Sequence, residues 1–381
     1  MKRWLNGGLV SVAIALIFML VACTPQSASA PPAAVPQGTT APAAKAAPVV
    51  SAEQAAWDKV VEAAKKEGRL NFYTFYFTGD KGMAMANAFE NRYGIKLDII
   101  TGRGSEFTER LKTEQRMGQM TGDVVATSST HMENMRQAGL LIPSLDLPVL
   151  NEKDVWAIHP TFHNKEGYYL DYQRYFLTTF INTNLVKPGE EPKSFADLLA
   201  PKWKGNLIMA DPVLSESPSR FVLFIQQKHL SEDYPTRLGQ QDLKFDPSTV
   251  GAVAKLARGE AAATVFVSTM EAIQMAAEGA PIRIVDMKEG TVTDTEAMGA
   301  IKGSPHPNAA KVFLNFVYSQ EGQKLLGEKI KTFPVRKGII ANVPQAIQLE
   351  PSNPLVVDLE GVQMTAKAFR DKQFVSQLKP K

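Results

Sequence analysis

Strand-like and helix-like segments alternate from residue 51 to about residue 140, and this alternation constrains the fold more than any other feature. Apolar residues recur at helical spacing between Trp57 and Ala64, after a capping-box pattern that starts at Ser51. The elements expected next are strand 70–77, helix 83–92, strand 95–101, strand 122–126 and helix 131–138. Strands that alternate with helices form a parallel, doubly wound sheet, so an α/β fold is predicted.

The part of the chain from Ser51 onward has about 330 residues, which is more than one hydrophobic core usually serves. A second set of elements follows the first: strands 172–182 and 204–210, helix 218–227, and a helix end followed by a strand within 259–267. A long amphipathic helix is expected at 308–327. We therefore expect two α/β domains, each with a doubly wound sheet and flanking helices.

The N-terminus has the pattern of a secretory signal. Lys2 and Arg3 precede an apolar run at 9–22, which is shorter than the 20 or so helical residues that span a bilayer. The run ends at Leu20-Val21-Ala22-Cys23, which resembles the bacterial lipobox, so Cys23 is the predicted lipidation site. A chance cysteine after an ordinary signal, or a short uncleaved anchor, remains an alternative.

Residues 23–50 are rich in Ala and Pro and have no apolar face, so they are expected to form a disordered tether. Cys23 is the only cysteine of the chain. A disulfide within the mature fold and a cysteine nucleophile are therefore excluded, and the folded part must depend on its core.

Charge and motifs exclude several classes of function. The formal net charge is +3, and it falls to +1 once Lys2 and Arg3 leave with the signal, so a nucleic-acid partner is not expected. Sequence patterns of a nucleophile elbow, a phosphate-binding loop and a zinc protease are all missing. His159 and His163 have helical spacing, but Pro160 lies between them, so a surface loop is predicted there. We predict no catalytic residue, no metal site and no cofactor.

Candidate binding residues stand where strands give way to helices. In open α/β sheets, ligands bind beyond the carboxyl ends of strands, and helix N-termini present free N–H groups and partial positive charge. Arg103, between two glycines, is expected to pair with a carboxylate or phosphonate, with a solvated loop arginine as the alternative. Ordinary turns and caps are the alternative for the rest. The candidates are Phe75, Tyr76, Thr78, Arg103, Gly104, Ser128, Ser129, Tyr175, Asp211, Ser217, Ser268, Thr269 and Thr291.

Several ordered stretches resemble the extracellular solute-binding proteins of ABC importers, in the branch that includes ferric-ion-binding proteins. They cover nearly all of 53–340, and each is weak alone, whereas the ordered set is quite specific. The stretches are Glu62–Gly68, Ile181–Val186, Phe195–Gly205, Ala210–Pro212, Leu256–Ala262, Ala309–Gln323 and Phe333–Arg336.

The resemblance implies a two-lobed periplasmic-binding-protein fold of type II, whose lobes close on a small-molecule solute and then dock on a membrane permease. Lobe 1 would comprise 53–178 with 293–340, and lobe 2 would comprise 179–292; residues 341–381 are expected to be helices of uncertain lobe. The protein would be a monomer outside the cytoplasmic membrane, anchored through lipid on Cys23. An anchored enzyme or a sensor on the same scaffold is the alternative.

The solute is expected to be a small organic or oxyanionic compound, such as a carboxylate, a phosphonate or a sugar phosphate. Ferric binders of this type carry adjacent tyrosines in the second lobe, but the matching segment here, 267–272, has none. Tyr168 and Tyr169 precede the expected hinge. Phe75, Tyr76 and Tyr175 are expected to stack on a carbon skeleton, and ferric iron remains the alternative solute.

Overall fold

The structure is a computed structural model in which the described residues belong to a unit running from Val50 to Lys381. The described residues are 51–215, 217–227, 229–348, 354–358, 360–361 and 372–379. The predicted signal 1–22, Cys23 with the tether to residue 50, and an expected helix at 362–367 lie outside them.

The elements alternate much as the sequence indicates. The strands are β1 (Arg69–Thr74), β2 (Lys96–Thr101), β3 (Val124–Ser128), β4 (Leu141–Ile142), β5 (Leu170–Asn182), β6 (Leu207–Ala210), β7 (Lys244–Asp246), β8 (Ala263–Thr264), β9 (Val267–Ser268), β10 (Ile282–Val285), β11 (Thr291–Ile301), β12 (Phe333–Pro334) and β13 (Pro354–Val356). The α-helices are α1 (Ala52–Glu67), α2 (Gly79–Tyr93), α3 (Gly104–Met117), α4 (Ser129–Gln137), α5 (Phe221–Gln226), α6 (Tyr234–Gly239), α7 (Thr249–Ala257), α8 (Thr269–Ala277), α9 (Pro307–Tyr318), α10 (Gln320–Lys324) and α12 (Lys372–Leu378).

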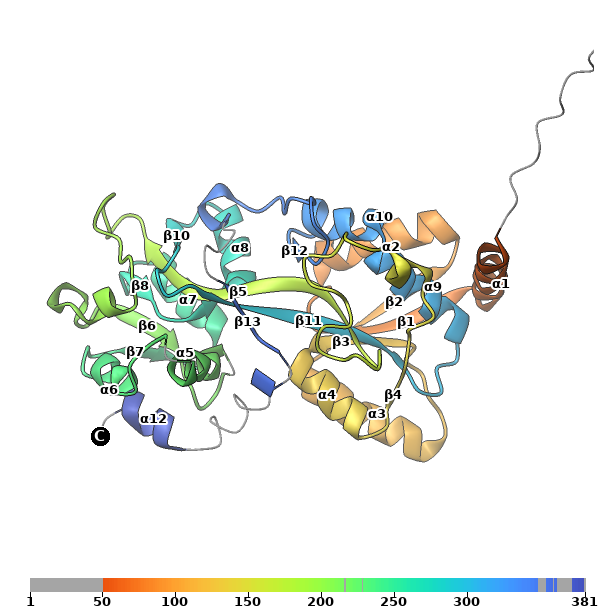
Figure 1. Cartoon of the computed structure of the whole chain (residues 1–381), viewed down its shortest axis with the longest axis horizontal. Helices are drawn as coiled ribbons and strands as arrows, with labels where there is room; N and C mark the ends of the chain where they lie inside the picture. The colour runs from red at the N-terminus through yellow and green to blue at the C-terminus, as the bar shows by residue number, and fades with distance from the viewer. Residues whose placement is uncertain are drawn as a thin grey trace, which may run out of the picture. The chain divides into compact units, whose positions relative to one another are not determined.

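The strands follow the order β2-β1-β3-β11-β5-β8-β6-β7 (Figure 1). Strands β2, β1 and β3 are mutually parallel, as are β8, β6 and β7. We call the first set with its helices the β1 half and the second set with its helices the β6 half. Each half is thus the parallel α/β unit that the sequence predicts.

Two long antiparallel strands, β5 and β11, connect the halves (Figure 1). On β11, Glu296–Ala300 pairs with β3, while Thr291–Thr293 pairs with β13 near the chain end. The later residues of β5 pair with β8, β9 and β10. Because β11 pairs with β3 of the β1 half, β5 pairs with β8 of the β6 half, and the two strands pair with each other, we call β5 and β11 the crossing strands.

Each half has its own hydrophobic cluster. Phe72, Phe89 and Phe313 pack together in the β1 half, where α1 lies on α9. Phe195, Phe221 and the aromatic residues around them form the cluster of the β6 half. Two separate cores fit a chain whose folded part exceeds the size that one core serves.

Several boundaries differ from the sequence expectation. The expected helix 308–327 breaks at Ser319, whose hydroxyl accepts from the Gly322 N–H at 3.1 Å and starts a new helix. The strand expected within 259–267 is split into β8 and β9 by Phe266, whose φ is 56°. Among the described residues, none of the helices has the length and apolar character needed to span a membrane.

Candidate ligand-binding site

A cavity of about 210 Å³ lies between the β1 half and the β6 half, over the crossing strands. This volume equals the space of about seven water molecules and is smaller than the pockets of drug-sized ligands. Both halves and both crossing strands contribute to its walls. The lining residues are Phe75, Ser128, Tyr175, Leu177, Ser215, Ser217, Arg220, Thr249, Ser268, Met270, Glu271 and Glu296.

A larger hollow of about 460 Å³ lies beside Trp57 at the start of the described chain. Its described lining includes no residue of the crossing strands and no arginine. The smaller cavity is the better candidate site, because strand ends and helix starts from both halves meet there.

Three helices begin at the small cavity, and each begins with a hydroxyl residue. Ser128 precedes α4, Thr249 is the first residue of α7, and Ser268 is the N-cap of α8. The Ser268 hydroxyl accepts from the Met270 N–H at 3.1 Å, while the Ser128 hydroxyl lies 2.9 Å from His131 Nδ1. Helix N-termini carry partial positive charge, so this end of the cavity favours an anionic group.

A chain of hydroxyls lines the wall formed by the β6 half. Ser215 and Thr249 lie 3.2 Å apart through their hydroxyl oxygens, and the Thr249 hydroxyl lies 3.4 Å from that of Ser217. Hydroxyls both donate and accept, so this wall suits the oxygen atoms of a polar solute.

A buried ion pair forms part of the cavity floor. Arg220 Nε donates to Asp294 Oδ2 at 2.9 Å, and the Tyr175 hydroxyl donates to the same oxygen at 3.0 Å. Both charged side chains are almost fully buried, at 5% and 1% exposure. Burial raises the pKa of Tyr175 well above its usual value, and the Asp294 carboxylate adds to the effect, so Tyr175 remains a phenol. The pair fixes Arg220 on the β6 half to a crossing strand.

Two further carboxyl side chains line the cavity. Glu296 is buried on β11, and Glu271 is the third residue of α8. Burial raises the pKa of Glu271, and a hydrogen bond from Ser268 and the charge of Lys81 only partly offset this. The cavity therefore combines an anion-favouring end with acidic groups.

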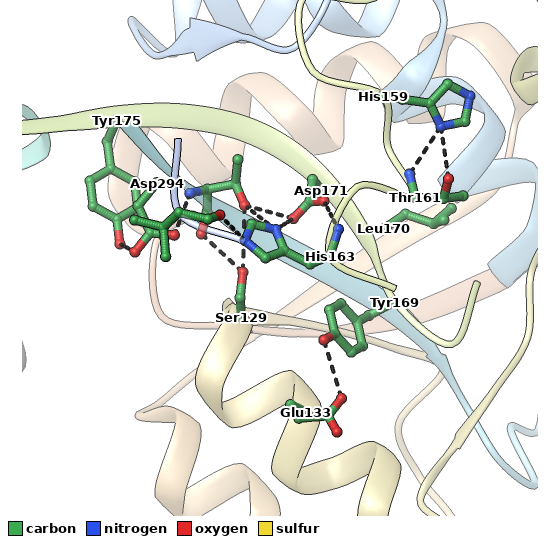
Figure 2. A network of polar contacts seen from close by, with 12 residues as sticks. Ser129, Glu133, His159, Thr161, His163, Tyr169, Leu170, Asp171, Tyr175 and Asp294 are labelled. Carbon is green, nitrogen blue, oxygen red and sulfur yellow. Dashed lines mark hydrogen bonds and ion pairs between the residues drawn. The ribbon is translucent and has the colours of Figure 1, made fainter. Parts of the chain in front are cut away.

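Behind the cavity, a polar network holds the crossing strands together (Figure 2). His163 Nδ1 lies 2.8 Å from Asp171 Oδ1, the Thr295 hydroxyl donates to that oxygen at 2.6 Å, and His163 Nε2 donates to the Val357 carbonyl at 2.6 Å. Both ring nitrogens face acceptors, so the geometry requires an imidazolium. Burial lowers the pKa of His163, but Asp171, Asp294 and the Val357 carbonyl together raise it more, to about 9. The predicted surface loop is wrong for His163, which is 2% exposed.

Five of the sequence candidates line the cavity, and three lie directly behind its walls. The five are Phe75, Ser128, Tyr175, Ser217 and Ser268. Ser129 donates to the Thr295 carbonyl at 3.2 Å, and the Thr269 hydroxyl accepts from the Phe176 N–H at 3.0 Å. Tyr76 is buried next to Phe75, and the Lys81 ammonium lies 4.0 Å from its ring centroid. These three side chains support the walls instead of lining them.

The other five candidates lie away from the cavity lining: Thr78, Arg103, Gly104, Asp211 and Thr291. Arg103 is exposed, and its backbone N–H donates to Glu106 Oε2 at 2.9 Å, so it belongs to the cap of α3. A Cβ on Gly104 would lie 2.5 Å from Thr127 Oγ1, so this glycine serves close packing.

Thr78 is exposed before α2, and Thr291 is buried at the start of β11. Asp211 accepts from the Val213 N–H at 2.8 Å and pairs with Lys379. For Thr78, Arg103, Gly104, Asp211 and Thr291, the cavity gives no support to the predicted ligand contact.

The sequence did not predict the charged residues that line the cavity. Glu271 follows Ser268 at capping-box spacing, and that pattern is explained by a cap without any ligand. Arg220 and Asp294 are 74 residues apart in the chain, and no local sequence pattern indicates that they form an ion pair. The missed lining residues are Leu177, Ser215, Arg220, Thr249, Met270, Glu271 and Glu296.

Known proteins resemble both the sequence and the fold. The chain is 22% identical over 271 residues to Iron uptake protein A1 of Synechocystis sp., covering 67% of this chain and 72% of that protein. Iron-bound HitA from Pseudomonas aeruginosa matches with a TM-score of 0.64 and 21% identity, over 81% of this chain and 99% of that one. AfuA from Actinobacillus pleuropneumoniae, with exogenous fructose-6-phosphate bound, matches with a TM-score of 0.61 and 22% identity, over 82% and 99%.

At these identities the structural likeness shows the fold, which is the two-lobed periplasmic-binding-protein fold of type II. The ligands named for those structures belong to those proteins. Residues 84–354 match the family model described as bacterial extracellular solute-binding protein, and this is more than half of the chain. The chain therefore belongs to the family of bacterial extracellular solute-binding proteins.

Proposed function

We propose that the protein captures a small organic solute with an anionic group in the 210 Å³ cavity and delivers it to the permease of an ABC importer. The proposal rests on one observation: the residues that line the cavity come from both halves and from a crossing strand. Ser128 comes from the β1 half, Arg220 from the β6 half, and Tyr175 from a crossing strand. A solute held by all three stabilises the closed arrangement of the halves, which is how a binding protein signals that it is loaded.

The anionic group is supported by the helix starts at Ser128, Thr249 and Ser268 and by the nearby Arg220. The carbon skeleton would lie against Phe75, which is 38% exposed, and Tyr175. Ferric iron is less well matched, because Tyr175 is the single tyrosine of the described lining and its pKa lies well above the usual value. Among the described residues, His, Cys, Asp and Glu form no group of three that would hold a metal ion.

The same proposal includes the cellular setting. Lipid on Cys23 would anchor a monomer outside the cytoplasmic membrane, with residues 23–50 as the tether and the lobe boundaries given above. The protein would act as a binder and not as an enzyme. The Ser128 hydroxyl does lie 2.9 Å from His131, but among the described residues no carboxylate forms a hydrogen bond or ion pair with that imidazole. A serine–histidine pair without an orienting acid lacks a part of the usual catalytic arrangement.

The proposal predicts that the purified protein is stabilised by its solute. At a concentration 100 times its Kd, a solute adds about 2.7 kcal/mol to the free energy of unfolding. Native mass spectrometry would identify any co-purified compound, and thermal unfolding against carboxylates, phosphonates, sugar phosphates and ferric ion would rank the classes. Stabilisation by ferric ion alone, with a coloured complex, would contradict the organic solute.

A pair of variants tests whether the cavity is the binding site. Ser217→Ala removes a hydroxyl from the lining and is expected to weaken solute binding by about threefold to tenfold, the value of one neutral hydrogen bond. Arg103→Ala, outside the lining, is the matched control and should change the affinity by less than twofold. Isothermal titration of both variants checks this, and the reverse pattern would place the solute at the start of α3.

A further inference from the structure

Glu271 stands at the start of α8 and also faces the cavity. It is the third residue of the helix, where a hydrogen bond from Ser268 reaches its carboxyl group, and the Ser268 hydroxyl also accepts from the Met270 N–H. The Glu271 side chain lines the cavity, and Met270 beside it packs against the core of the β1 half. The carboxyl group therefore lies at the place where the start of α8 meets the opposite half.

One oxygen of the Glu271 carboxyl group lacks a hydrogen-bond partner. Its Oε2 atom is shielded from solvent and has no hydrogen-bond partner among the described residues. Among the described residues, Glu271 forms no ion pair with a lysine, arginine or histidine within 4 Å. Lys81, the cation that acts on it, lies over the Tyr76 ring on the β1 half. Leaving a buried acid in this state is costly, because its charged form loses hydration without gaining a counter-ion.

Groups of the opposite half act on this carboxyl group. Tyr76 and Lys81 belong to the β1 half, and Glu271 belongs to the β6 half. Their mutual effects run across the cavity, since Glu271 raises the pKa of Tyr76 in addition to the larger effect of burial. An empty cavity leaves Glu271 Oε2 without a partner, whereas a positively charged solute group would satisfy it.

We propose that Glu271 determines specificity and that the solute presents a protonated amine to it, while the anionic group of the solute lies against Arg220 and the starts of α4 and α7. The inference rests on the proposed capture function. It narrows the solute to zwitterions, because the starts of α4 and α7 and Arg220 receive the anion while Glu271 receives the ammonium. An ammonium is a suitable partner because it carries charge and three donors, whereas a solute hydroxyl supplies one donor and no charge.

The test uses pairs of compounds that differ only in an amine and a hydroxyl. β-Alanine is compared with 3-hydroxypropionate, and glucosamine phosphate with glucose phosphate, by titration calorimetry and thermal unfolding of the full-length protein. We expect an amine member to bind at least tenfold more tightly than its hydroxyl partner. Glu271→Gln keeps the shape of the side chain and removes its charge, so this preference should fall to less than threefold. Glu278→Gln, on the exposed end of the same helix, should leave the preference unchanged.

Each of the remaining outcomes tests one part of the proposal: the amine, the role of Glu271 or the capture function. If the hydroxyl members bind as tightly as the amines, or if only ferric ion or neutral sugars bind, the amine is wrong while solute capture stands. If Glu271→Gln retains the full preference for amines over hydroxyl compounds, another group binds the amine and Glu271 does not determine specificity. If no pair member, co-purified compound or metal ion binds, the capture function itself fails.

Discussion

Replacing His163 with alanine is expected to destabilise the folded chain by about 3–5 kcal/mol, the effect of removing one partner from a buried ion pair. The substitution leaves the Asp171 carboxylate buried without its imidazolium and removes the donor to the Val357 carbonyl. Urea unfolding followed by circular dichroism measures the change. His159→Ala is the matched control, because that ring is partly exposed and has no buried carboxylate partner among the described residues, so its effect should stay below about 1 kcal/mol.

The same pair predicts the direction of a pH effect. The pKa of His163 is about 9 in the folded chain against an ordinary value of 6.5, so the folded state binds the proton more tightly. The resulting stabilisation is fully present below pH 6.5 and is lost as the pH rises through 9; the shift corresponds to about 3 kcal/mol. The difference in stability between the wild type and His163→Ala should therefore shrink between these values. A difference that stays constant from pH 6 to pH 10 would count against a charged His163.

The second large effect is expected at Arg220. Arg220→Ala leaves Asp294 buried without its ion-pair partner and should cost about 3–5 kcal/mol of stability, together with at least tenfold in solute affinity. Asp294→Ala should have a comparable effect on stability, since it leaves the guanidinium without that carboxylate.

A double-mutant cycle measures the interaction energy between Arg220 and Asp294. The double variant should be less destabilised than the sum of the single variants, with a coupling of more than 1 kcal/mol. Arg237→Ala provides the control, because that side chain is about half exposed on α6 and its pair with Asp233 spans 4.0 Å. Strict additivity of the Arg220 and Asp294 effects would show that their contact does not stabilise the floor of the cavity.

The sequence predicts the repeating α/β organisation because that information is local. Apolar periodicity between Trp57 and Ala64 indicates α1, and the aromatic density after Leu70 indicates β1. Boundaries are less accurate where a single residue overrides the pattern, as Ser319 does by capping a new helix. The expected lobe limits and the lipidation of Cys23 stay predictions.

The site was predictable only in its general location. The rule that ligands bind beyond strand ends led to Phe75, Ser128 and Ser268. The same rule selected Arg103, because a guanidinium at a helix start looks alike in sequence whether it faces a cavity or water. The sequence could not predict the roles of Glu271 and Arg220, since these depend on contacts between residues far apart in the chain.

The pairing of β13 with β11 has a consequence for how the molecule is made. Ribosomes deliver the N-terminal residues first, so both cores can begin to form while the C-terminal end is still missing. The acceptor for His163 Nε2 is the carbonyl of Val357, and the Val357 N–H donates to the Thr293 carbonyl at 2.9 Å. Long-range pairings of this kind form late, because the chain entropy of closing a large loop must be overcome first. The pairing of β13 with β11 is therefore completed after the rest of the chain has been synthesised, and a chain that ends before Val357 would lack both the acceptor for His163 and the part of the β6-half core that Val357, Phe374 and Leu378 form.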